Sequence, residues 1–202
     1  MNAINKQVAT SAELLEKHNA YISDLTNSVD LDGMLTDERW HFNRRLGIGG
    51  SDVGAILGVN QYKSPLDVYN EKRAYVGPSD LSGNEAVHFG NVLEPIVADE
   101  YARRTGQKVE VRNKHYKAAG RPWICGNIDR YVVGAKKVME CKTSSGFVKG
   151  WGETGTDQVP ESYMAQVVSY QIATGYLNEA DLAVLIDGRD FRIYSIPYNE
   201  AL

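Results

Sequence analysis

The fold is decided by the stretch Cys125-Gly-Asn-Ile-Asp129-Arg-Tyr-Val-Val-Gly-Ala-Lys-Lys-Val-Met-Glu140-Cys-Lys142. It contains two runs rich in β-branched and aromatic residues, separated by a turn that begins at Gly134, and therefore predicts a β-hairpin. Strand side chains alternate in direction, so Glu140 and Lys142 should project from one face of the second strand. Met139 and Cys141 should project from the other face and pack on a core, which leaves the charged pair off the core.

The acidic residue Asp129 stands at the head of the first run of this hairpin. If Asp129 lies across from Glu140 and Lys142, two carboxylates and one ammonium group converge at one end of a sheet. Oxygen ligands of this kind suit Mg²⁺, and a lysine beside the ion can orient one of its waters. The competing interpretation is an exposed hairpin with an ordinary Glu/Lys pair, and the spacing alone does not decide between them.

Length and composition indicate one substantial soluble domain. The chain has 202 residues, of which 43% are hydrophobic and 24% charged, and two domains would be cramped. No apolar run approaches the ~20 residues needed to span a bilayer, and a signal-peptide core is missing, so we expect a cytoplasmic protein without membrane contact. The two cysteines, Cys125 and Cys141, are too few for a zinc site and are expected to be free thiols.

The charge balance leaves the partner open. A net charge of −4 argues against a protein that coats nucleic acid nonspecifically, although a local basic groove remains compatible with it. Basic residues do gather in the middle of the chain, in the order Arg103-Arg104, Lys108, Arg112, Lys114, Lys117 and Arg121.

A glycine-rich loop provides a second candidate site. The sequence predicts an N-terminal helical extension over residues 1–38, with a helix at about 10–24 and a loop up to Thr36. In the following segment, Gly47-Ile-Gly-Gly50 precedes a helix through residues 53–57, which Ser51 or Asp52 could cap. Backbone N–H groups at such a helix start suit a phosphate, and Arg44 and Arg45 would add donors. The alternative is a turn whose glycines serve geometry alone.

The remaining elements alternate between helices and strands. Helices are predicted over 64–73, 85–105 and 159–175, and strands over 108–112, 180–186 and 190–196. The long helix should face the core with a stripe made of Val92-Leu93, Ile96-Val97 and Tyr101, with Glu94 at its edge. Gln166 and Tyr170 share a face of the last helix. The order predicts an α/β (α+β) fold, a single domain over 39–202 with a mixed, mostly antiparallel sheet flanked by helices.

These segments together resemble one family. The sequence is similar to the YqaJ-like viral recombinase nucleases, relatives of phage lambda exonuclease within the PD-(D/E)xK superfamily, whose core is restriction-endonuclease-like. The resemblance covers roughly residues 40–196 and is carried by five segments in the family's order. They are Trp40-x3-Arg44-x2-Gly-Ile-Gly-Gly-Ser51-Asp-Val, Gly90-Asn-Val-Leu-Glu94-Pro, Gly126-Asn-Ile-Asp129, Glu140-Cys-Lys142 and Met164-Ala-Gln166-x3-Tyr170. Ile128 precedes Asp129 where the superfamily name has proline.

The resemblance implies roles for these residues. Asp129 and Glu140 would bind Mg²⁺, or Mn²⁺ as a substitute, with the backbone carbonyl of Cys141 as a further ligand. Glu94 would complete the site or help to hold a second ion. Lys142 would orient the attacking water. The remaining implied roles are a positioning role for Gln166, with Tyr170 as a weaker candidate, and 5′-phosphate binding by Arg44 and Ser51, with Arg45 as the alternative arginine.

The implied activity is metal-dependent 5′-to-3′ hydrolysis of one strand at the ends of double-stranded DNA. This reaction would release 5′-mononucleotides and leave a 3′ single-stranded tail for phage-type recombination in a bacterial cell. The resemblance also implies a homotrimer and a single-strand annealing protein as partner. Two alternatives use the same residues: an endonuclease on the same core, and a DNA-end-binding module without catalysis. A further alternative, an acidic scaffold protein that does not bind nucleic acid, is supported by the net charge alone.

Overall fold

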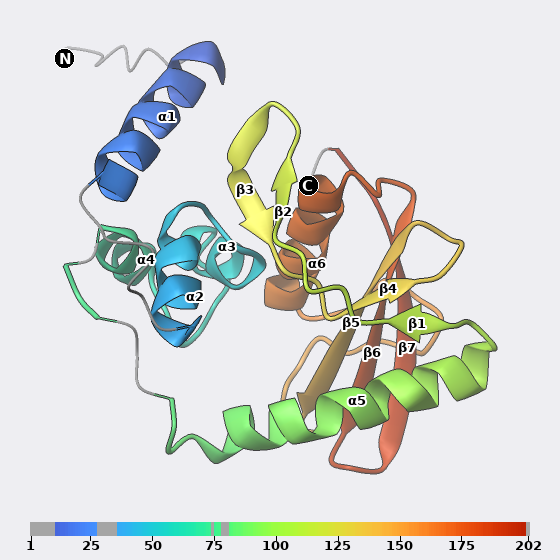
Figure 1. Ribbon diagram of the computed structural model, residues 1–202. Coiled ribbons are helices and arrows are strands. Elements are labelled where there is room, and N and C mark those ends of the chain that lie inside the picture. Colours follow the sequence, from blue (N-terminus) through green and yellow to red (C-terminus); the bar gives the residue numbers. More distant parts are fainter. Residues whose placement is uncertain (1–10, 28–35, 74, 78–80, 201–202) are drawn as a thin grey trace, which may run out of the picture.

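The computed structural model describes residues 11–27, 36–73, 75–77 and 81–200, and its elements form a sheet covered by a helix on each face (Figure 1). The helices are α1 (Ser11–Asn27), α2 (Thr36–Arg45), α3 (Gly50–Ile56), α4 (Pro65–Lys72), α5 (Glu85–Thr105) and α6 (Glu161–Thr174). The strands are β1 (Val109–Glu110), β2 (Tyr116–Ala118), β3 (Arg121–Gly126), β4 (Arg130–Val132), β5 (Lys137–Ser144), β6 (Glu179–Ile186) and β7 (Asp190–Pro197).

The main sheet has the order β1-β4-β5-β6-β7, and its β5–β6 pair is parallel while the others are antiparallel. This confirms the expected α/β fold with a mixed, mostly antiparallel sheet. The β4–β5 hairpin is also confirmed, with Arg130 opposite Met139. The crossover between the parallel strands is α6, which ends at Gly175 in the left-handed conformation that suits glycine.

Both faces of the sheet are buried, which corrects one expectation from the sequence. Met139 and Cys141 pack with Val97 and Tyr101 beneath α5, as the alternation predicts. The opposite face is covered by α6, so Glu140 is only 1% exposed rather than off the core. The alternation gave the correct grouping of side chains, but it carried no information about the second covering helix.

The core-facing stripe of α5 differs from the predicted one. Val97, Ala98 and Tyr101 are buried, whereas Val92 and Ile96 are about half exposed. Helical spacing of three and four residues places Glu94 in line with the buried positions. The prediction of Val92 and Ile96 as core residues was therefore wrong, and Glu94 lies on the face of α5 that is turned toward the sheet.

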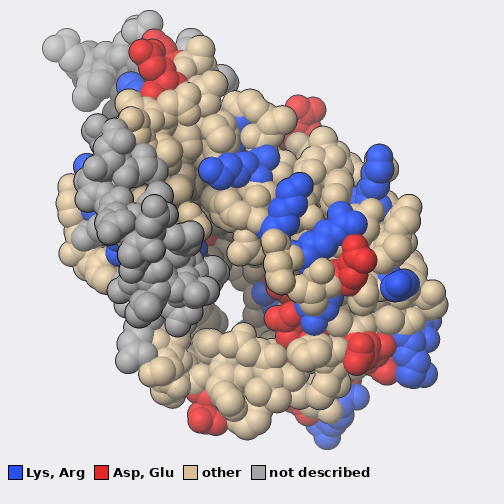
Figure 2. Space-filling view, viewed as in Figure 1, with Lys and Arg blue, Asp and Glu red and all other residues tan. Residues whose placement is uncertain are grey.

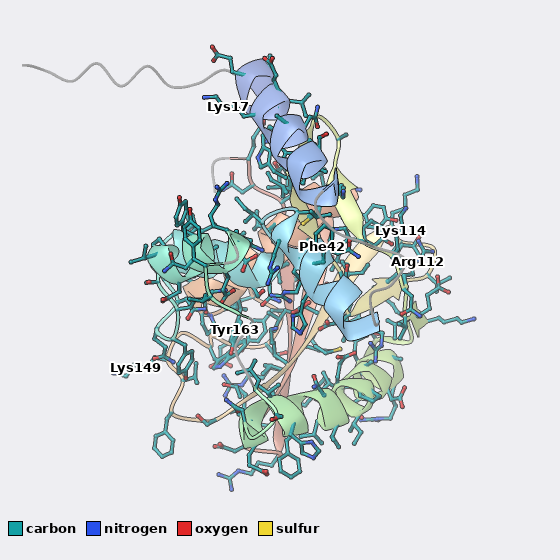
Figure 3. The ribbon with its side chains drawn as sticks, turned by 60° about the vertical axis from the view of Figure 1, so that its left-hand side comes forward. Lys17, Phe42, Arg112, Lys114, Lys149 and Tyr163 are labelled. Carbon is teal, nitrogen blue, oxygen red and sulfur yellow. The ribbon has the colours of Figure 1, made fainter. Side chains whose placement is uncertain are left out.

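The N-terminal half also differs in detail. The N-cap of α3 is Gly49 rather than Ser51 or Asp52, because Asp52 lies one turn into the helix and its Oδ2 accepts a hydrogen bond from the Gly49 N–H at 2.9 Å. The predicted helix over 64–73 is confirmed, with Ser64 as its cap. Phe42 of α2 is buried and points into the interior (Figure 3). The loop expected up to Thr36 lies largely outside the described residues.

A second, two-stranded sheet formed by β2 and β3 was not predicted, and the strand expected over 108–112 is limited to Val109–Glu110. The β2–β3 hairpin stands apart from the main sheet, between α1 and α6 (Figure 1). The ring of Trp123 in β3 contacts His18 of α1 at 6.0 Å. On the face seen in Figure 2, basic side chains gather over this hairpin.

Both cysteines are buried free thiols, as expected. None of the described helices combines the length and apolar character that crossing a membrane requires. The boundary predicted between residues 38 and 39 stays a prediction.

Candidate active site

The β4–β5 hairpin brings Asp129, Glu140 and Lys142 together. Asp129 immediately precedes β4, and its Oδ2 accepts a hydrogen bond from the backbone N–H of Cys141 at 2.9 Å. This bond fixes Asp129 beside the strand that carries Glu140. Lys142 follows on the same face, with its Nζ 2.7 Å from Glu140 Oε1. The predicted convergence of two carboxylates and an ammonium group is thus present in the structure.

Glu140 is the most deeply placed member of this group. Its Oε1 receives both Lys142 and the amide of Gln166, whose Nε2 donates at 2.8 Å. Its Oε2 is buried and has no hydrogen-bond partner. A buried carboxylate oxygen without a partner is costly, and the usual compensation is a bound cation or a proton. This donor set therefore fits a hard divalent ion.

The electrostatics agree with that arrangement. Burial raises the pKa of Asp129 well above its ordinary range, and the neighbouring charge of Glu140 raises it further, although Lys142 opposes the shift. Burial acts to lower the pKa of Lys142, but the charges of Glu140 and Asp129 outweigh it and raise that pKa overall. Lys142 thus stays protonated, and the nearby charge of Glu140 disfavours the ionised form of Asp129.

Glu94 reaches the same region from α5 but has a different partner. Its Oε1 forms an ion pair with Nη1 of Arg130, which also donates to the carbonyl of Asp129 at 2.8 Å. Arg130 was not identified from the sequence. Among the described residues, no three Asp, Glu, His or Cys side chains form a metal-binding group. A metal at this position would therefore rely on Asp129 and Glu140, backbone oxygen and several waters, as Mg²⁺ often does.

Gln166 and Tyr170 connect the carboxylates to a neighbouring pocket. Gln166 Nε2 lies 3.0 Å from the hydroxyl of Tyr170, so the predicted i,i+4 pair is formed. The Tyr170 ring packs against Gly50 and Gly126, where a Cβ atom would come within 2.6 and 2.7 Å of the ring. Two of the glycines thus serve close packing, and they allow the α3 and β3 ends to approach α6.

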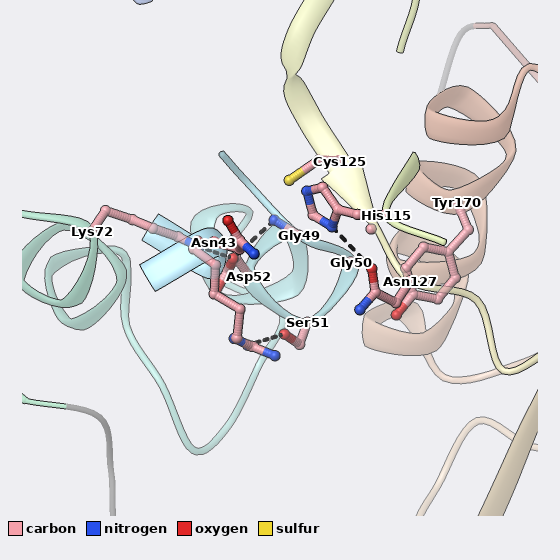
Figure 4. A pocket seen from close by; sticks show the side chains of 12 residues that line it. Asn43, Gly49, Gly50, Ser51, Asp52, Lys72, His115, Cys125, Asn127 and Tyr170 are labelled. Carbon is pink, nitrogen blue, oxygen red and sulfur yellow. Dashed lines mark hydrogen bonds and ion pairs between the residues drawn. The ribbon is translucent and has the colours of Figure 1, made fainter. Parts of the chain in front are cut away.

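The pocket itself has a volume of about 270 Å³ and lies between α3 and the end of β3 (Figure 4). On one wall, Arg44 Nη2 donates to Ser51 Oγ at 3.0 Å. On the opposite wall, His115 Nδ1 lies 2.9 Å from Asn127 Oδ1, which leaves the Asn127 amide nitrogen turned toward the side of the pocket that carries Ser51. His115 and Asn127 were not identified from the sequence, although Asn127 lies only two residues before Asp129.

Lys72 and Asp52 hold this pocket together. Asp52 is 1% exposed, and Lys72 Nζ lies 2.6 Å from it while also donating to the backbone carbonyl of Arg44. The second lysine at Asp52 is Lys63, at 3.3 Å. Arg45 does not line this pocket; it lines an adjoining, larger pocket of about 670 Å³, which Arg44, Ser51 and Lys72 also border.

A mixed sheet between two helices, with acidic residues and a lysine on a central hairpin, is the architecture of a restriction-endonuclease-like domain. Solved structures agree at the level of the fold. The alkaline exonuclease LHK-Exo from Laribacter hongkongensis matches with a TM-score of 0.56 and 15% identity, covering 81% of this chain and 84% of that one. LHK-Exo in complex with dAMP matches with a TM-score of 0.55 and 16% identity, over the same shares of the two chains. A phage-related exonuclease from Haemophilus somnus 129PT matches with a TM-score of 0.53 and 15% identity, over 77% and 86%.

The chain belongs to the YqaJ-like viral recombinase domain family, whose model matches residues 39–177. It is 39% identical over 159 residues to the uncharacterized protein YqaJ of Bacillus subtilis strain 168. That match covers 78% of this chain and 49% of the relative, so the chain spans about half the length of the curated relative. The family resemblance drawn from the five sequence segments is confirmed.

Proposed function

We propose that this protein is a metal-dependent 5′-to-3′ exonuclease that degrades one strand of linear double-stranded DNA to 5′-mononucleotides. The observation that carries the proposal is the buried, unpartnered Oε2 of Glu140 in a cluster with Asp129 and Lys142. Family membership supports it, and so does the likeness in fold to exonucleases. The structure of LHK-Exo with dAMP gives an example of a nucleotide bound to this fold.

Asp129 and Glu140 would hold Mg²⁺, with the Cys141 carbonyl and Glu94 as further candidate ligands and Mn²⁺ as a possible substitute. The ion, when bound, lowers the pKa of a coordinated water and offsets negative charge on the phosphate. Glu94 would have to exchange its contact with Arg130 to take part. In this proposal Asp129 and Glu140 are the principal ligands.

Lys142 supplies a fixed positive charge beside the reacting phosphate. Because the pKa of Lys142 is raised, the side chain donates hydrogen bonds to water and to phosphate oxygens instead of accepting a proton. Gln166 keeps Glu140 in place through its 2.8 Å hydrogen bond, and Tyr170 supports Gln166 in turn. Gln166 and Tyr170 are therefore positioning residues in this mechanism.

The pocket beside Tyr170 would bind the 5′-terminal phosphate. Arg44 presents a guanidinium group that matches phosphate oxygens, Ser51 adds a hydroxyl donor, and the Asn127 amide closes the opposite wall. A terminal phosphate held there would place the first internucleotide bond toward Glu140. This requirement for an end favours an exonuclease over an endonuclease on the same core.

The reaction leaves a 3′ single-stranded tail, which is the substrate of strand annealing. We therefore propose a single-strand annealing protein as the functional partner in the cytoplasm of a bacterial cell, and a homotrimer as the working assembly. Size measurement by light scattering tests the trimer, because it separates a trimer from a monomer or dimer directly.

The activity is tested with linear duplex DNA labelled at its 5′ or its 3′ ends, beside a closed circular duplex, with Mg²⁺ or with EDTA. We expect Mg²⁺-dependent release of labelled mononucleotides from 5′ ends while the circle stays intact. Cutting of the circle would instead establish the endonuclease alternative. Retained binding to ends without hydrolysis would establish the end-binding module.

A further inference from the structure

The β2–β3 hairpin carries an unusual concentration of positive charge. From Val111 to Ile128 the sequence contains no Asp or Glu, although the chain as a whole has 26 acidic residues and a net charge of −4. The basic residues of this segment are Arg112, Lys114, Lys117 and Arg121. Figure 2 shows Lys and Arg side chains in a row over the hairpin and the segment that leads into it.

Three of these cations have no acidic partner within the described part of the chain. Among the residues that the structure describes, no carboxylate forms an ion pair with Lys114, Lys117 or Arg121. Elsewhere in the fold, basic side chains such as Arg103, Arg104 and Arg192 are paired with neighbouring acids. The hairpin therefore keeps its charge available for an external anion.

Burial and packing explain why these side chains point outward. In β2, Tyr116 and Ala118 are buried and the intervening Lys117 is exposed. The ammonium group of Lys114 lies 4.8 Å from the centre of the Tyr116 ring. Arg112 is different, because it pairs with Glu110 and covers the ring of Tyr131. Arg112 and Lys114 lie side by side at the edge of the molecule (Figure 3).

The charged hairpin is continuous with the pocket beside the candidate active site. His115, between Lys114 and Tyr116, lines that pocket, and so do Cys125 and Asn127. The strand register pairs Lys117 with Cys125, so both project on the same face of the hairpin. A polymer anion held by its end in the pocket can therefore extend directly onto Lys117 and its neighbours.

We propose that Lys114, Lys117 and Arg121 form a binding surface for the phosphate backbone of duplex DNA whose 5′ end lies in the pocket. This inference rests on the proposed function. The six residues of β3 extend over roughly 20 Å, a length that faces about six phosphates of one DNA strand. Contacts of this kind carry no sequence preference, which suits an enzyme that must advance along any DNA.

The test measures the binding of the full chain to a blunt, fluorescently labelled duplex in EDTA, by fluorescence anisotropy, between about 50 and 200 mM salt. Replacing Lys114, Lys117 and Arg121 together by Gln should reduce the slope of log Kd against log salt concentration by about 2 to 3. A variant that replaces Lys136, Lys149 and Arg189 by Gln removes the same charge elsewhere. We expect the control variant to keep the wild-type slope.

Equal slopes in the two variants would overturn the proposal, because the effect would then reflect net charge alone. A loss of affinity that does not depend on salt would also overturn it. Thermal unfolding of each variant checks the fold, and the single change Lys117→Gln, with an expected slope change of about 0.9, replaces the triple variant if that variant is unstable.

The proposed function can fail separately from this inference. Cleavage of the end-labelled duplex is measured in parallel with Mg²⁺. A wild-type chain that binds duplex through the hairpin without cleaving it would refute the nuclease and leave the binding surface in place. A chain that cleaves normally, with an unchanged salt slope in the hairpin variant, would refute the binding surface alone.

Discussion

Gly126 is a position where one added methyl group should disturb the candidate site. A Cβ at Gly126 would lie 2.7 Å from Cε1 and 2.8 Å from Cδ1 of the Tyr170 ring. That ring is 7% exposed and is packed among core residues. Gly126→Ala must therefore displace the ring or the strand, and overpacking of this kind costs about 2 kcal/mol. For a chain of this length we expect the Tm to fall by roughly 4–8 °C.

The assay is thermal unfolding followed by circular dichroism, with Gly83→Ala as the matched control. A Cβ at Gly83 meets no atom within 4 Å, so the control should unfold like the wild type. In a Tyr170→Leu background the smaller side chain leaves room, and Gly126→Ala should cost less than half as much. If Gly126→Ala and Gly83→Ala unfold at the same temperature, the contact with Tyr170 is not as tight as the structure indicates and the reasoning is refuted.

Three further predictions concern the candidate site. Lys142→Ala should abolish Mg²⁺-dependent cleavage of labelled duplex while unfolding temperature and DNA binding in EDTA stay close to wild type; normal turnover would exclude Lys142 from the mechanism. Arg44→Ala should reduce the rate advantage of 5′-phosphorylated over 5′-hydroxyl ends by about tenfold, through loss of a charged hydrogen bond, whereas Arg45→Ala should not; the reverse result would move the phosphate contact to Arg45. Asp52→Asn should lower the free energy of unfolding by about 2 kcal/mol at neutral pH, less than for a fully buried pair because its lysines are partly exposed. Burial acts to raise the pKa of Asp52, but the charge and hydrogen bond of Lys72, together with its other partners, outweigh burial and the pKa is lowered overall. The ion pair therefore stabilises the folded state fully above the unfolded pKa of about 4. This stabilisation is lost as the pH falls through the pKa of Asp52 in the folded state. Urea unfolding should show the two proteins converging at low pH, and a difference that persists there would contradict the ion-pair explanation.

The parts of the fold that could be predicted are those with a strong local signal. The hairpin that carries Asp129 and Glu140 was predicted from the β-branched runs on either side of Gly134. Its two strands, β4 and β5, pair antiparallel as expected. Because Gln166 and Tyr170 are spaced i,i+4, their side chains share one face of α6 and contact each other regardless of how the helix packs on the sheet. Gly106 ends α5 in the left-handed conformation that favours glycine at a helix C-terminus.

Other features depend on packing that no local pattern records. Both sides of α5 carry apolar residues, so periodicity alone could not show that Val97 rather than Val92 faces the sheet. The burial of Glu140 depends on α6, which follows it in the chain and returns over the sheet. The pair formed by His115 and Asn127 comes from the ends of two short strands, which lack the length for a clear alternation.

The same is true of the ion pair between Glu94 and Arg130, which joins α5 to the start of β4. Each partner has an ordinary surface pattern in the sequence, and only the packing of the helix on the sheet brings them together. The candidate ligands were therefore predictable as residue types and positions, but their actual partners were not.

The parallel pairing of β5 with β6 has a consequence for how the molecule is assembled. Parallel neighbouring strands cannot be joined by a tight turn, so β5 and β6 pair only when the whole connection through α6 is closed. Closing this long connection costs conformational entropy. That same closure delivers Gln166 and Tyr170 to Glu140. The strand pairing with the largest chain separation in the main sheet and the completion of the candidate site are thus one event, and a nascent or partly folded chain would lack an organised candidate site.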